Sequence, residues 1–261
     1  MENNLKFIKY HLPCPACNSS DALSLNEDGS AKCFSCDKFF PKYNVNPTAP
    51  IGESKVEAIN SHGGIYAPLP DRHISQQTAE KYRVKSIFGS SGVIAQHLYP
   101  YYIHNELTAT KIRTIKDKDF TWKGSPTGTG LFGQNIFKEG GKYITITEGE
   151  CDAMAAYELL GSKWAVVSIK NGAAGAVRSI KENLEYVESF NNVVICFDSD
   201  KEGKEAATKV ARILKPGKAK ILNLPTGFKD ANEMLVKKEY EKFVSSWWDS
   251  KVYTPSGIIR I

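Results

Sequence analysis

The chain has 261 residues, of which 41% are hydrophobic and 24% are charged, and its formal net charge is +5. This length accommodates one or two hydrophobic cores and a small additional module, and the composition is typical of a soluble globular protein. No apolar run is long enough to cross a membrane, and the N-terminus lacks the apolar segment of a signal peptide. We therefore expect a cytoplasmic protein without membrane association.

Four of the six cysteines form two pairs with the spacing C-x₂-C-x₁₅-C-x₂-C. Two such pairs supply the four thiolates of a tetrahedral structural zinc site, which predicts one bound Zn²⁺. The alternative, a pair of disulfides, is typical of secreted domains and is disfavoured without a signal peptide. The predicted zinc ligands are Cys14, Cys17, Cys33 and Cys36. The other two cysteines, Cys151 and Cys196, lie in or beside predicted core elements and should be buried thiols.

Residues 1–43 are predicted to form this zinc-binding domain, a small β module of the zinc-ribbon type. Residues 22–25 and 30–34 alternate like the strands of a hairpin, with Asp28-Gly29 as the turn. Basic and aromatic side chains surround the second cysteine pair, where they can fill the small core or hold single-stranded nucleic acid, and we expect both. These side chains are Lys32, Phe34, Lys38, Phe39 and Phe40.

Residues 44–64 are rich in proline, glycine and asparagine, which predicts a flexible linker. Within it, residues 53–60 could form a short helix.

Residues 65–141 should form a basic α+β subdomain, with a helix beginning at Ser75 and strands at 99–103 and 108–115. The stretch 63–147 holds 11 basic and 6 acidic side chains, which suits phosphate binding but also an ordinary solvated surface. Lys111 and Arg113 share one strand face and Lys118 lies in the turn beyond it, a pattern that an exposed charged hairpin would also explain.

Residues 142–252 alternate between strand and helix signals, which predicts an α/β core with a mainly parallel sheet. Strands are expected at 142–147, 164–169, 193–197 and 219–224. Helices are expected at 153–160, 201–214 and 240–248, and another after Gly175 that continues to about Phe190. The run 193–197 is apolar throughout, as expected for a parallel strand covered on both faces. Residues 253–261 form a C-terminal tail.

Acidic side chains follow three of these strands, where an open α/β sheet builds its binding site. Carboxylates gathered at one edge repel one another unless a cation neutralises them, and oxygen donors favour Mg²⁺ or Mn²⁺. Solvated acidic loops would explain either of the first two clusters alone, whereas the two together favour a metal site. The acidic residues are Glu148, Glu150, Asp152, Asp198, Asp200 and Asp230.

Glu148-Gly149 followed by Asp198-Ser-Asp200 resembles the Toprim signature of DnaG-type primases, topoisomerases and some nucleases. The run from Lys229 to Glu233 (KDANE) and the Tyr10–Cys14 segment (YHLPC) are similar to the primase portion of phage primase–helicases of the T-seven type. The resemblance covers nearly the whole chain. It implies a Toprim catalytic subdomain at 142–252 and a DNA-dependent RNA primase, which makes short RNA primers on single-stranded DNA for replication by two-metal nucleotidyl transfer.

The resemblance also assigns roles to individual residues. Asp198 and Asp200 would hold two Mg²⁺ or Mn²⁺ ions, and Glu148 would be a further ligand or the general base. Additional ligands or supporting catalytic residues would be Glu150, Asp152 and Asp230. Nucleotide or template would be bound by Lys111, Arg113 and Lys118, although one extra residue separates the two lysines relative to the family.

The resemblance implies four partners: a single-stranded DNA template, ribonucleoside triphosphates, a DNA polymerase and a replicative helicase, fused or separate. It also implies that the protein acts in a bacterial or phage-infected cell.

Two other functions share these motifs. RecR-like clamps join a four-cysteine zinc site to a Toprim fold without catalysis, but they begin with a helix-hairpin-helix segment that is not recognisable before Cys14. A Toprim nuclease could use the same metal site to activate water.

Overall fold

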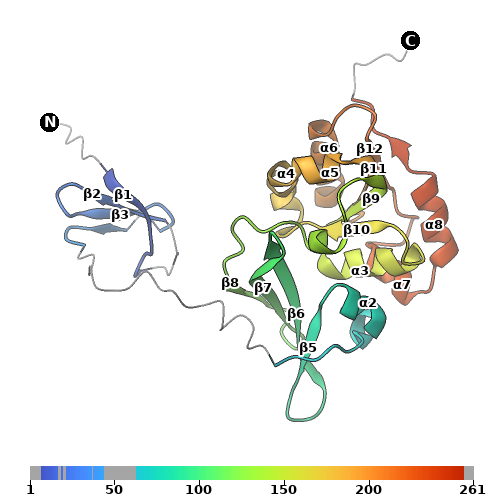
Figure 1. Ribbon diagram of the computed structural model, residues 1–261, viewed down its shortest axis with the longest axis horizontal. Helices are drawn as coiled ribbons and strands as arrows, with labels where there is room; N and C mark the ends of the chain where they lie inside the picture. Colours follow the sequence, from blue (N-terminus) through green and yellow to red (C-terminus); the bar gives the residue numbers. More distant parts are fainter. Residues whose placement is uncertain (1–6, 17–18, 20–21, 37, 44–62, 256–261) are drawn as a thin grey trace. The chain divides into compact units, whose positions relative to one another are not determined.

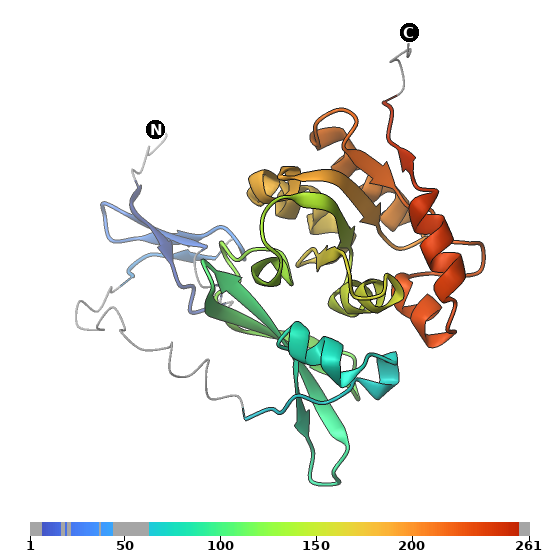
Figure 2. The same cartoon turned by 45° about the vertical axis from the view of Figure 1, so that its right-hand side comes forward.

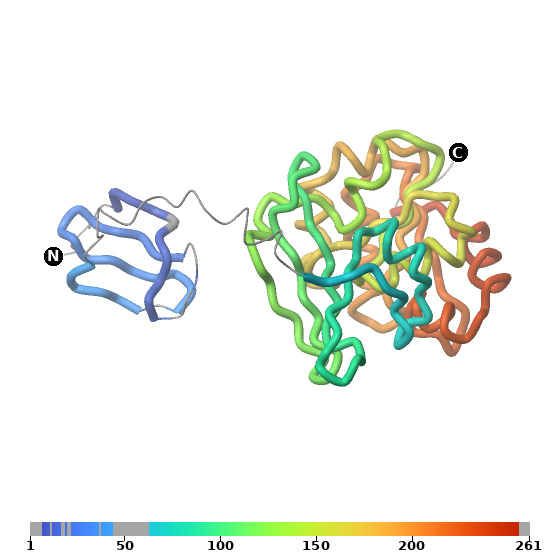
Figure 3. The backbone as a smooth tube through the Cα atoms, turned by 60° about the horizontal axis from the view of Figure 1, so that its bottom comes forward, coloured from blue at the N-terminus to red at the C-terminus, as the bar shows by residue number. Residues whose placement is uncertain are grey.

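The computed structural model describes residues 7–16, 19, 22–36, 38–43 and 63–255. The chain divides into two compact units, Met1–Glu53 and Ser54–Ile261, with the division inside the expected linker. Figure 3 traces the backbone of each unit. The linker itself, with its expected helix at 53–60, lies almost entirely outside the described residues, and the finer domain boundaries stay a prediction.

The first unit is an antiparallel sheet whose buried residues cluster with Cys14 and Cys33. Its strands lie in the order β1 (Phe7–Leu12), β2 (Leu23–Asn26), β3 (Ala31–Cys33) and β4 (Phe39–Phe40). The predicted turn is confirmed, because Gly29 adopts a φ of 81° and the Asp28 carboxylate accepts a hydrogen bond from the Ser30 amide. Phe40 packs against the buried cluster, whereas Phe34 and Phe39 are exposed, so these aromatic residues divide between core and surface as expected.

The second unit begins with another antiparallel sheet. After the short 3₁₀ helix η1 (Pro70–Arg72), α2 (Gln76–Lys81) starts at its predicted cap, where the Ser75 hydroxyl accepts a hydrogen bond from the Thr78 amide. The sheet has the order β5 (Lys85–Phe88), β6 (Ile94–Ile103), β7 (Glu106–Thr114) and β8 (Phe120–Gly124). The edge strands β5 and β8 were not predicted, because each is partly exposed and so short, at four and five residues, that a periodic signal does not stand out.

The predicted α/β core follows the 3₁₀ helix η2 (Gln134–Ile136). Its strands lie in the order β10 (Ala165–Ser168), β9 (Gly141–Thr147), β11 (Phe190–Cys196), β12 (Ala219–Ile221) and β13 (Lys251–Val252), and all but β13 are parallel. Its helices are α3 (Glu150–Leu159), α4 (Gly172–Glu182), α5 (Leu184–Glu188), α6 (Lys201–Ile213), α7 (Ala231–Val236) and α8 (Tyr240–Trp248).

Three details of this core differ from the sequence expectations. The helix expected between Gly175 and about Phe190 begins earlier, at Gly172, and is two helices, because the chain leaves helical geometry at Asn183. The strand expected at 219–224 ends at Ile221, where the chain turns out of the sheet towards Pro225 and Gly227. Helix α7 was not predicted, because its six residues are too few to show helical periodicity, although Asp230 caps it by accepting from the Glu233 amide.

Helices cover both faces of the parallel sheet (Figures 1 and 2). Helices α3, α7 and α8 pack on the face that includes Val166 and Val194, and α4, α5 and α6 pack on the face that includes Val167 and Val193. The apolar run of β11 is therefore buried on both sides, as predicted. Within the described part of the chain, no helix has the length and apolar character needed to cross a membrane.

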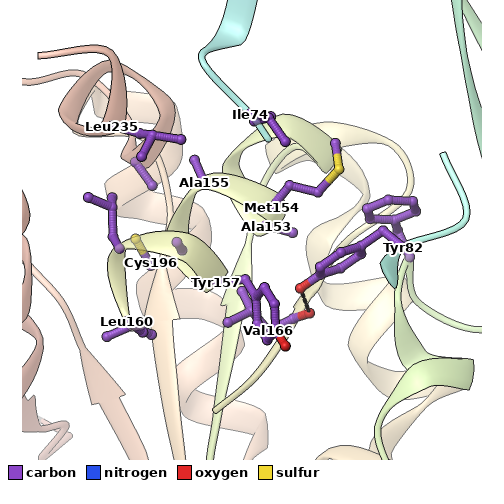
Figure 4. Packing of buried hydrophobic residues seen from close by; sticks show 14 of the residues in the cluster. Ile74, Tyr82, Ala153, Met154, Ala155, Tyr157, Leu160, Val166, Cys196 and Leu235 are labelled. Atoms are coloured by element: carbon purple, nitrogen blue, oxygen red, sulfur yellow. Dashed lines mark hydrogen bonds between the residues drawn. The ribbon is translucent and has the colours of Figure 1, made fainter. Parts of the chain in front are cut away.

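The antiparallel and parallel sheets share one hydrophobic core. Tyr82, which follows α2, stacks on Phe132 and donates its hydroxyl hydrogen to the Val166 carbonyl of β10 at 2.8 Å (Figure 4). Met154 and Tyr157 of α3 belong to the same buried cluster. The basic segment and the α/β core are therefore fixed relative to each other, and the edge of one can complete a site on the other.

A buried polar group holds η1 against β6 and β7. His97 is completely buried, with Nε2 3.8 Å from Asp71 Oδ1, and Arg113 donates to Asp71 Oδ2 at 3.1 Å. Burial lowers the pKa of His97 to about 4; Arg113 and Arg72 also lower it, and Asp71 opposes them. His97 is therefore neutral in the folded protein at pH 7.

We expect acid to destabilise the wild-type second unit more than a His97→Gln variant. The unfolded histidine binds a proton near pH 6.5 and the folded one only near pH 4, so this contribution is complete above pH 6.5 and is lost as the pH falls towards 4. Between pH 7.5 and 4.5 the free energy of unfolding, measured with urea, should fall by about 2 kcal/mol more in the wild type. The exposed residue His104 provides the control, His104→Gln, which should follow the wild type. Identical pH dependence in all three proteins would contradict the assignment.

Candidate active site

The acidic residues that follow β9 and β11 emerge at one edge of the parallel sheet. Thr147 and Cys196, the last residues of these strands, are paired in register. Glu148 follows Thr147 directly, and Asp198 and Asp200 lie two and four residues after Cys196, so the backbone delivers all three to the same edge. Burial, and after it the charges of Asp198 and Asp200, raises the pKa of Glu148, so the three carboxylates interact.

Glu148 has one oxygen that accepts a hydrogen bond and one that is left without a partner. Its Oε1 accepts from the Ala173 amide at the start of α4, at 3.0 Å. Its Oε2 is buried and has no hydrogen-bond partner among the described residues. The preceding Gly172 has a φ of 63°, which favours glycine at the point where the α4 backbone approaches this carboxylate. A buried carboxylate oxygen of this kind is suited to bind a cation.

Asp198 and Asp200 are fixed by the start of α6. Asp200 caps the helix by accepting from the Gly203 amide at 2.8 Å. Gly203 is required here, because a Cβ atom at this position would overlap the Asp198 backbone. Burial raises the pKa of Asp198, while Lys229, whose Nζ lies 3.2 Å from Asp198 Oδ2, lowers it. Lys229 thus partly balances the negative charge at this edge.

Asp152 and Asp230 meet at the start of α7. Asp152 Oδ1 accepts a hydrogen bond from the Asn232 amide at 3.1 Å, and burial followed by the charges of Asp230 and Asp198 raises the pKa of Asp152 well above its ordinary value. Asn232 is buried, and its carboxamide both donates to the Arg72 carbonyl and accepts from the Arg72 guanidinium. Neither Arg72 nor Asn232 was predicted as a site residue, although Asn232 lies in the KDANE run, because nothing in their local sequence indicates a contact between residues so distant in the chain.

Glu150 forms a buried ion pair, unlike Asp198, whose partner Lys229 is exposed. It is buried, and its Oε1 accepts from the Tyr101 hydroxyl at 2.6 Å and from Lys111 Nζ at 2.8 Å. Lys111 Nζ also donates to the Lys170 carbonyl and lies 4.8 Å from the centre of the Phe120 ring. Glu150 and Lys111, predicted to act on metal and nucleotide respectively, are thus bound to each other.

The other two predicted nucleotide-binding residues have different surroundings. The Arg113 side chain is 6% exposed and is bound to Asp71. Lys118 is exposed in the turn between β7 and β8, with a φ of 58°. In this structure Lys118 is therefore accessible to a ligand, whereas Arg113 braces β7.

The donors at the acidic edge fit a divalent cation. Among the described residues, no three carboxylates have oxygen atoms within 4.8 Å of one another, so the edge is an open arrangement of ligands. The unpartnered oxygen of Glu148 and the raised pKa values of Glu148 and Asp198 nevertheless indicate negative charge that a cation would stabilise. All these donors are hard oxygen atoms, which suit Mg²⁺ or Mn²⁺.

The cysteines of the first unit form a separate cluster. The Sγ atoms of Cys14, Cys33 and Cys36 lie within 4.8 Å of one another, and the sulfur atoms of Cys14 and Cys36 are 3.8 Å apart. The amides of Ala16 and Ser35 donate to the sulfur atoms of Cys14 and Cys33, each at 3.4 Å. Three thiols converge without a disulfide among the described residues, which is the arrangement expected of a metal site. Cys17, the fourth predicted ligand, lies outside the described residues.

Comparison with known proteins identifies the family. Residues 145–235 match the model of Toprim-like domains. The chain is 31% identical to the DNA helicase/primase of Enterobacteria phage T3 over 262 residues, which covers 96% of this chain and 45% of the phage protein. It is 32% identical to the crystallised primase fragment of the bacteriophage T7 primase-helicase protein, with a TM-score of 0.65 and coverage of 92% of this chain and 99% of that fragment. The chain belongs to the phage primase family.

A further relative shows this primase fold bound to other molecules. The structure is that of the bacteriophage T7 lagging-strand DNA polymerase interacting with primase domains that are bound to an RNA/DNA hybrid and dTTP. The matched chain in that structure is 32% identical to this chain, with a TM-score of 0.66, and the match covers 73% of this chain and 94% of the matched chain. The predicted fold class, a zinc-ribbon-like module with a Toprim α/β core, is confirmed.

We expect Glu148→Gln to stabilise the metal-free protein, because it removes one of several mutually repelling charges. The free energy of unfolding at neutral pH should rise by up to about 1 kcal/mol, after allowance for screening by solvent. Mg²⁺ should raise the melting temperature of the wild type more than that of the variant, because a ligand that binds only the folded state stabilises it. Glu205→Gln, on the exposed face of α6, is the control and should behave as the wild type in both measurements. A Glu148→Gln variant that is less stable and responds fully to Mg²⁺ would contradict this account.

Proposed function

We propose that this chain is a DNA-dependent RNA primase, which joins ribonucleoside triphosphates into short RNA primers on single-stranded DNA. The observation that carries the proposal is the convergence of Glu148, Asp198 and Asp200 at one sheet edge, in a chain that matches the T7 primase fragment over nearly its full length. The relative bound to an RNA/DNA hybrid and dTTP supports the same class of substrates.

In the proposed reaction, the 3′-hydroxyl of one nucleotide attacks the α-phosphate of the next, and pyrophosphate leaves. Asp198, Asp200 and Glu148 would hold two Mg²⁺ or Mn²⁺ ions, which when bound neutralise charge on the attacking and leaving oxygens. As the alternative to binding an ion, Glu148 would accept the proton of the attacking hydroxyl at its unpartnered Oε2, and its raised pKa suits that role. Asp152, in the first turn of α3, and Asp230, the cap of α7, would support this set.

The basic residues would contribute unequally to binding. Lys118, exposed on the β7–β8 turn, is free to approach template or triphosphate. Lys111 would act from its position beside Glu150, close enough to the acidic edge to attract phosphate. Arg113 is the least suited of the three to bind nucleotide directly, because its guanidinium is buried against Asp71.

The first unit would hold one Zn²⁺ through its cysteines and read a short template sequence, with its exposed aromatic side chains available for base stacking. A replicative helicase and a DNA polymerase are the proposed partners, because the T3 relative is a helicase/primase and the T7 primase domains interact with a polymerase. The proposed place of action is the cytoplasm of a bacterial or phage-infected cell.

The test uses single-stranded DNA of mixed sequence, Mg²⁺ and labelled ribonucleotides, with products resolved on denaturing gels. We expect short RNA oligomers that disappear without template or with a chelator. Shortened DNA in place of RNA would instead identify a nuclease. Tight DNA binding with neither product would identify a non-catalytic clamp of the RecR type.

Asp198→Asn should reduce primer synthesis by about 100-fold or more, because it removes a carboxylate charge that would hold the catalytic cations. The rate of incorporation of labelled ribonucleotides measures the effect, and a urea unfolding curve shows that the variant is folded. Glu205→Gln serves again as the control and should retain wild-type activity. Undiminished synthesis by a folded Asp198→Asn variant would refute the proposed site.

Removal of zinc should destabilise the fold of the first unit and leave that of the second unit intact. In Cys36→Ser, zinc content measured by atomic emission should fall from one ion per chain to near zero, because three thiolates hold the ion far more weakly than four. Template-dependent synthesis should fall with it, while the unfolding transition of the second unit stays unchanged. Cys151→Ser is the matched control, since this cysteine lies in α3, and it should retain the zinc. Loss of zinc from the control as well would contradict the proposed ligand set.

A further inference from the structure

Aromatic rings gather at the amino end of the parallel sheet, the end opposite the acidic edge. Tyr143 lies near the start of β9, Trp164 directly precedes β10, and Trp248 is the last residue of α8. The ring of Trp248 lies 5.6 Å from that of Tyr143 and 6.5 Å from that of Trp164. Its neighbour Trp247 is buried and anchors α8 by donating from Nε1 to Thr145 Oγ1 at 2.9 Å. Trp248 is therefore left on the surface, 51% exposed.

Three lysines surround these rings. Lys142 and Lys220 place their ammonium groups 5.9 Å and 5.5 Å from the centre of the Tyr143 ring, and Lys163 lies 5.1 Å from that of Trp164. Lys142 and Lys163 are exposed and Lys220 is half-buried. None of the three ammonium groups has a carboxylate of the described residues within 4.0 Å. The neighbouring Asp249 accepts a hydrogen bond from Ser245 within its own helix turn.

We propose that this surface, which we call the tryptophan–lysine surface, binds a segment of single-stranded nucleic acid. It comprises Lys142, Tyr143, Lys163, Trp164, Lys220 and Trp248. Unpaired ammonium groups attract phosphates, and an exposed indole offers a stacking face to any base, so this mixture binds single strands with little sequence preference. A protein partner fits less well, because lysine is depleted in protein–protein interfaces even though tryptophan is enriched there.

The tryptophan–lysine surface is distinct from the proposed catalytic edge. Tyr143 and Glu148 are separated by five residues of nearly extended chain, which is about 17 Å along β9. A nucleotide bound at the surface would therefore not contact Glu148. The inference rests on the proposed function for the source of the strand, which would be template beyond the segment being copied. Its role would be to retain the template while primers are made and released.

The experiment measures the affinity of the full chain for labelled single-stranded DNA of about 40 nucleotides by fluorescence anisotropy. A chelator is present, so the result does not depend on catalysis and can fail independently of the proposed primase activity. We expect Lys142→Glu combined with Lys163→Glu to weaken binding about tenfold at moderate salt. It should also reduce the slope of log affinity against log salt by about 1.4, because two phosphate contacts are lost.

Trp248→Ala should weaken binding about tenfold, and Trp248→Phe should restore most of the affinity because it keeps an aromatic ring. The matched charge control combines Lys181→Glu with Lys209→Glu, two exposed lysines on α4 and α6, which cover the other face of the sheet. Melting temperatures show that each variant is folded. If the double variant of the tryptophan–lysine surface and the control double variant bind DNA with the same affinity and the same salt slope, the proposal is overturned. A protein then becomes the better candidate occupant. If the surface pair alone loses affinity and slope, the proposal is supported.

Discussion

The edge of the parallel sheet carries more negative charge than the protein itself neutralises, and much of the surrounding structure serves to hold that charge in place. The register of β9 and β11 delivers Glu148 and Asp198 to one edge. Because both carboxylates are partly buried, water does not fully screen the repulsion between their charges. The Ala173 amide and Lys229 offset part of the repulsion. One oxygen of Glu148 remains without a partner, which leaves a defined position for a cation.

The antiparallel sheet contributes directly to this balance, which explains why it forms one compact unit with the α/β core. Lys111 and Tyr101 reach from β7 and β6 to Glu150 at the start of α3, and Arg72 in η1 holds Asn232 at the start of α7. Both contacts fix helices whose first residues belong to the acidic region. A change in the antiparallel sheet should therefore alter the positions of acidic side chains that it does not itself provide.

The sequence predicted those parts of the structure whose signals are local. Apolar runs between glycine and proline residues located β9, β10 and β11, and the spacing of Cys14, Cys33 and Cys36 predicted their convergence. The sequence could not predict short elements such as α7, or the exposed edge strands β5 and β8, because four to six residues are too few to establish a periodic pattern. The sequence also could not predict contacts such as that of Arg72 with Asn232, because these contacts depend on how the two sheets pack rather than on the sequence of either segment.

Glu148 and Glu150 show most clearly what the folded structure adds. They are two residues apart in one acidic run, and only the resemblance to Toprim primases, not their local sequence, gives Glu148 the more direct role. The fold turns Glu148 towards α4 and leaves its Oε2 unpartnered, whereas Glu150 turns towards β6 and β7, where a hydroxyl and an ammonium group satisfy it. A carboxylate already paired with lysine has little to gain from a cation, while an unpartnered one beside Asp198 has much. The acidic run therefore divides into a residue suited to bind metal and a residue that joins the two sheets.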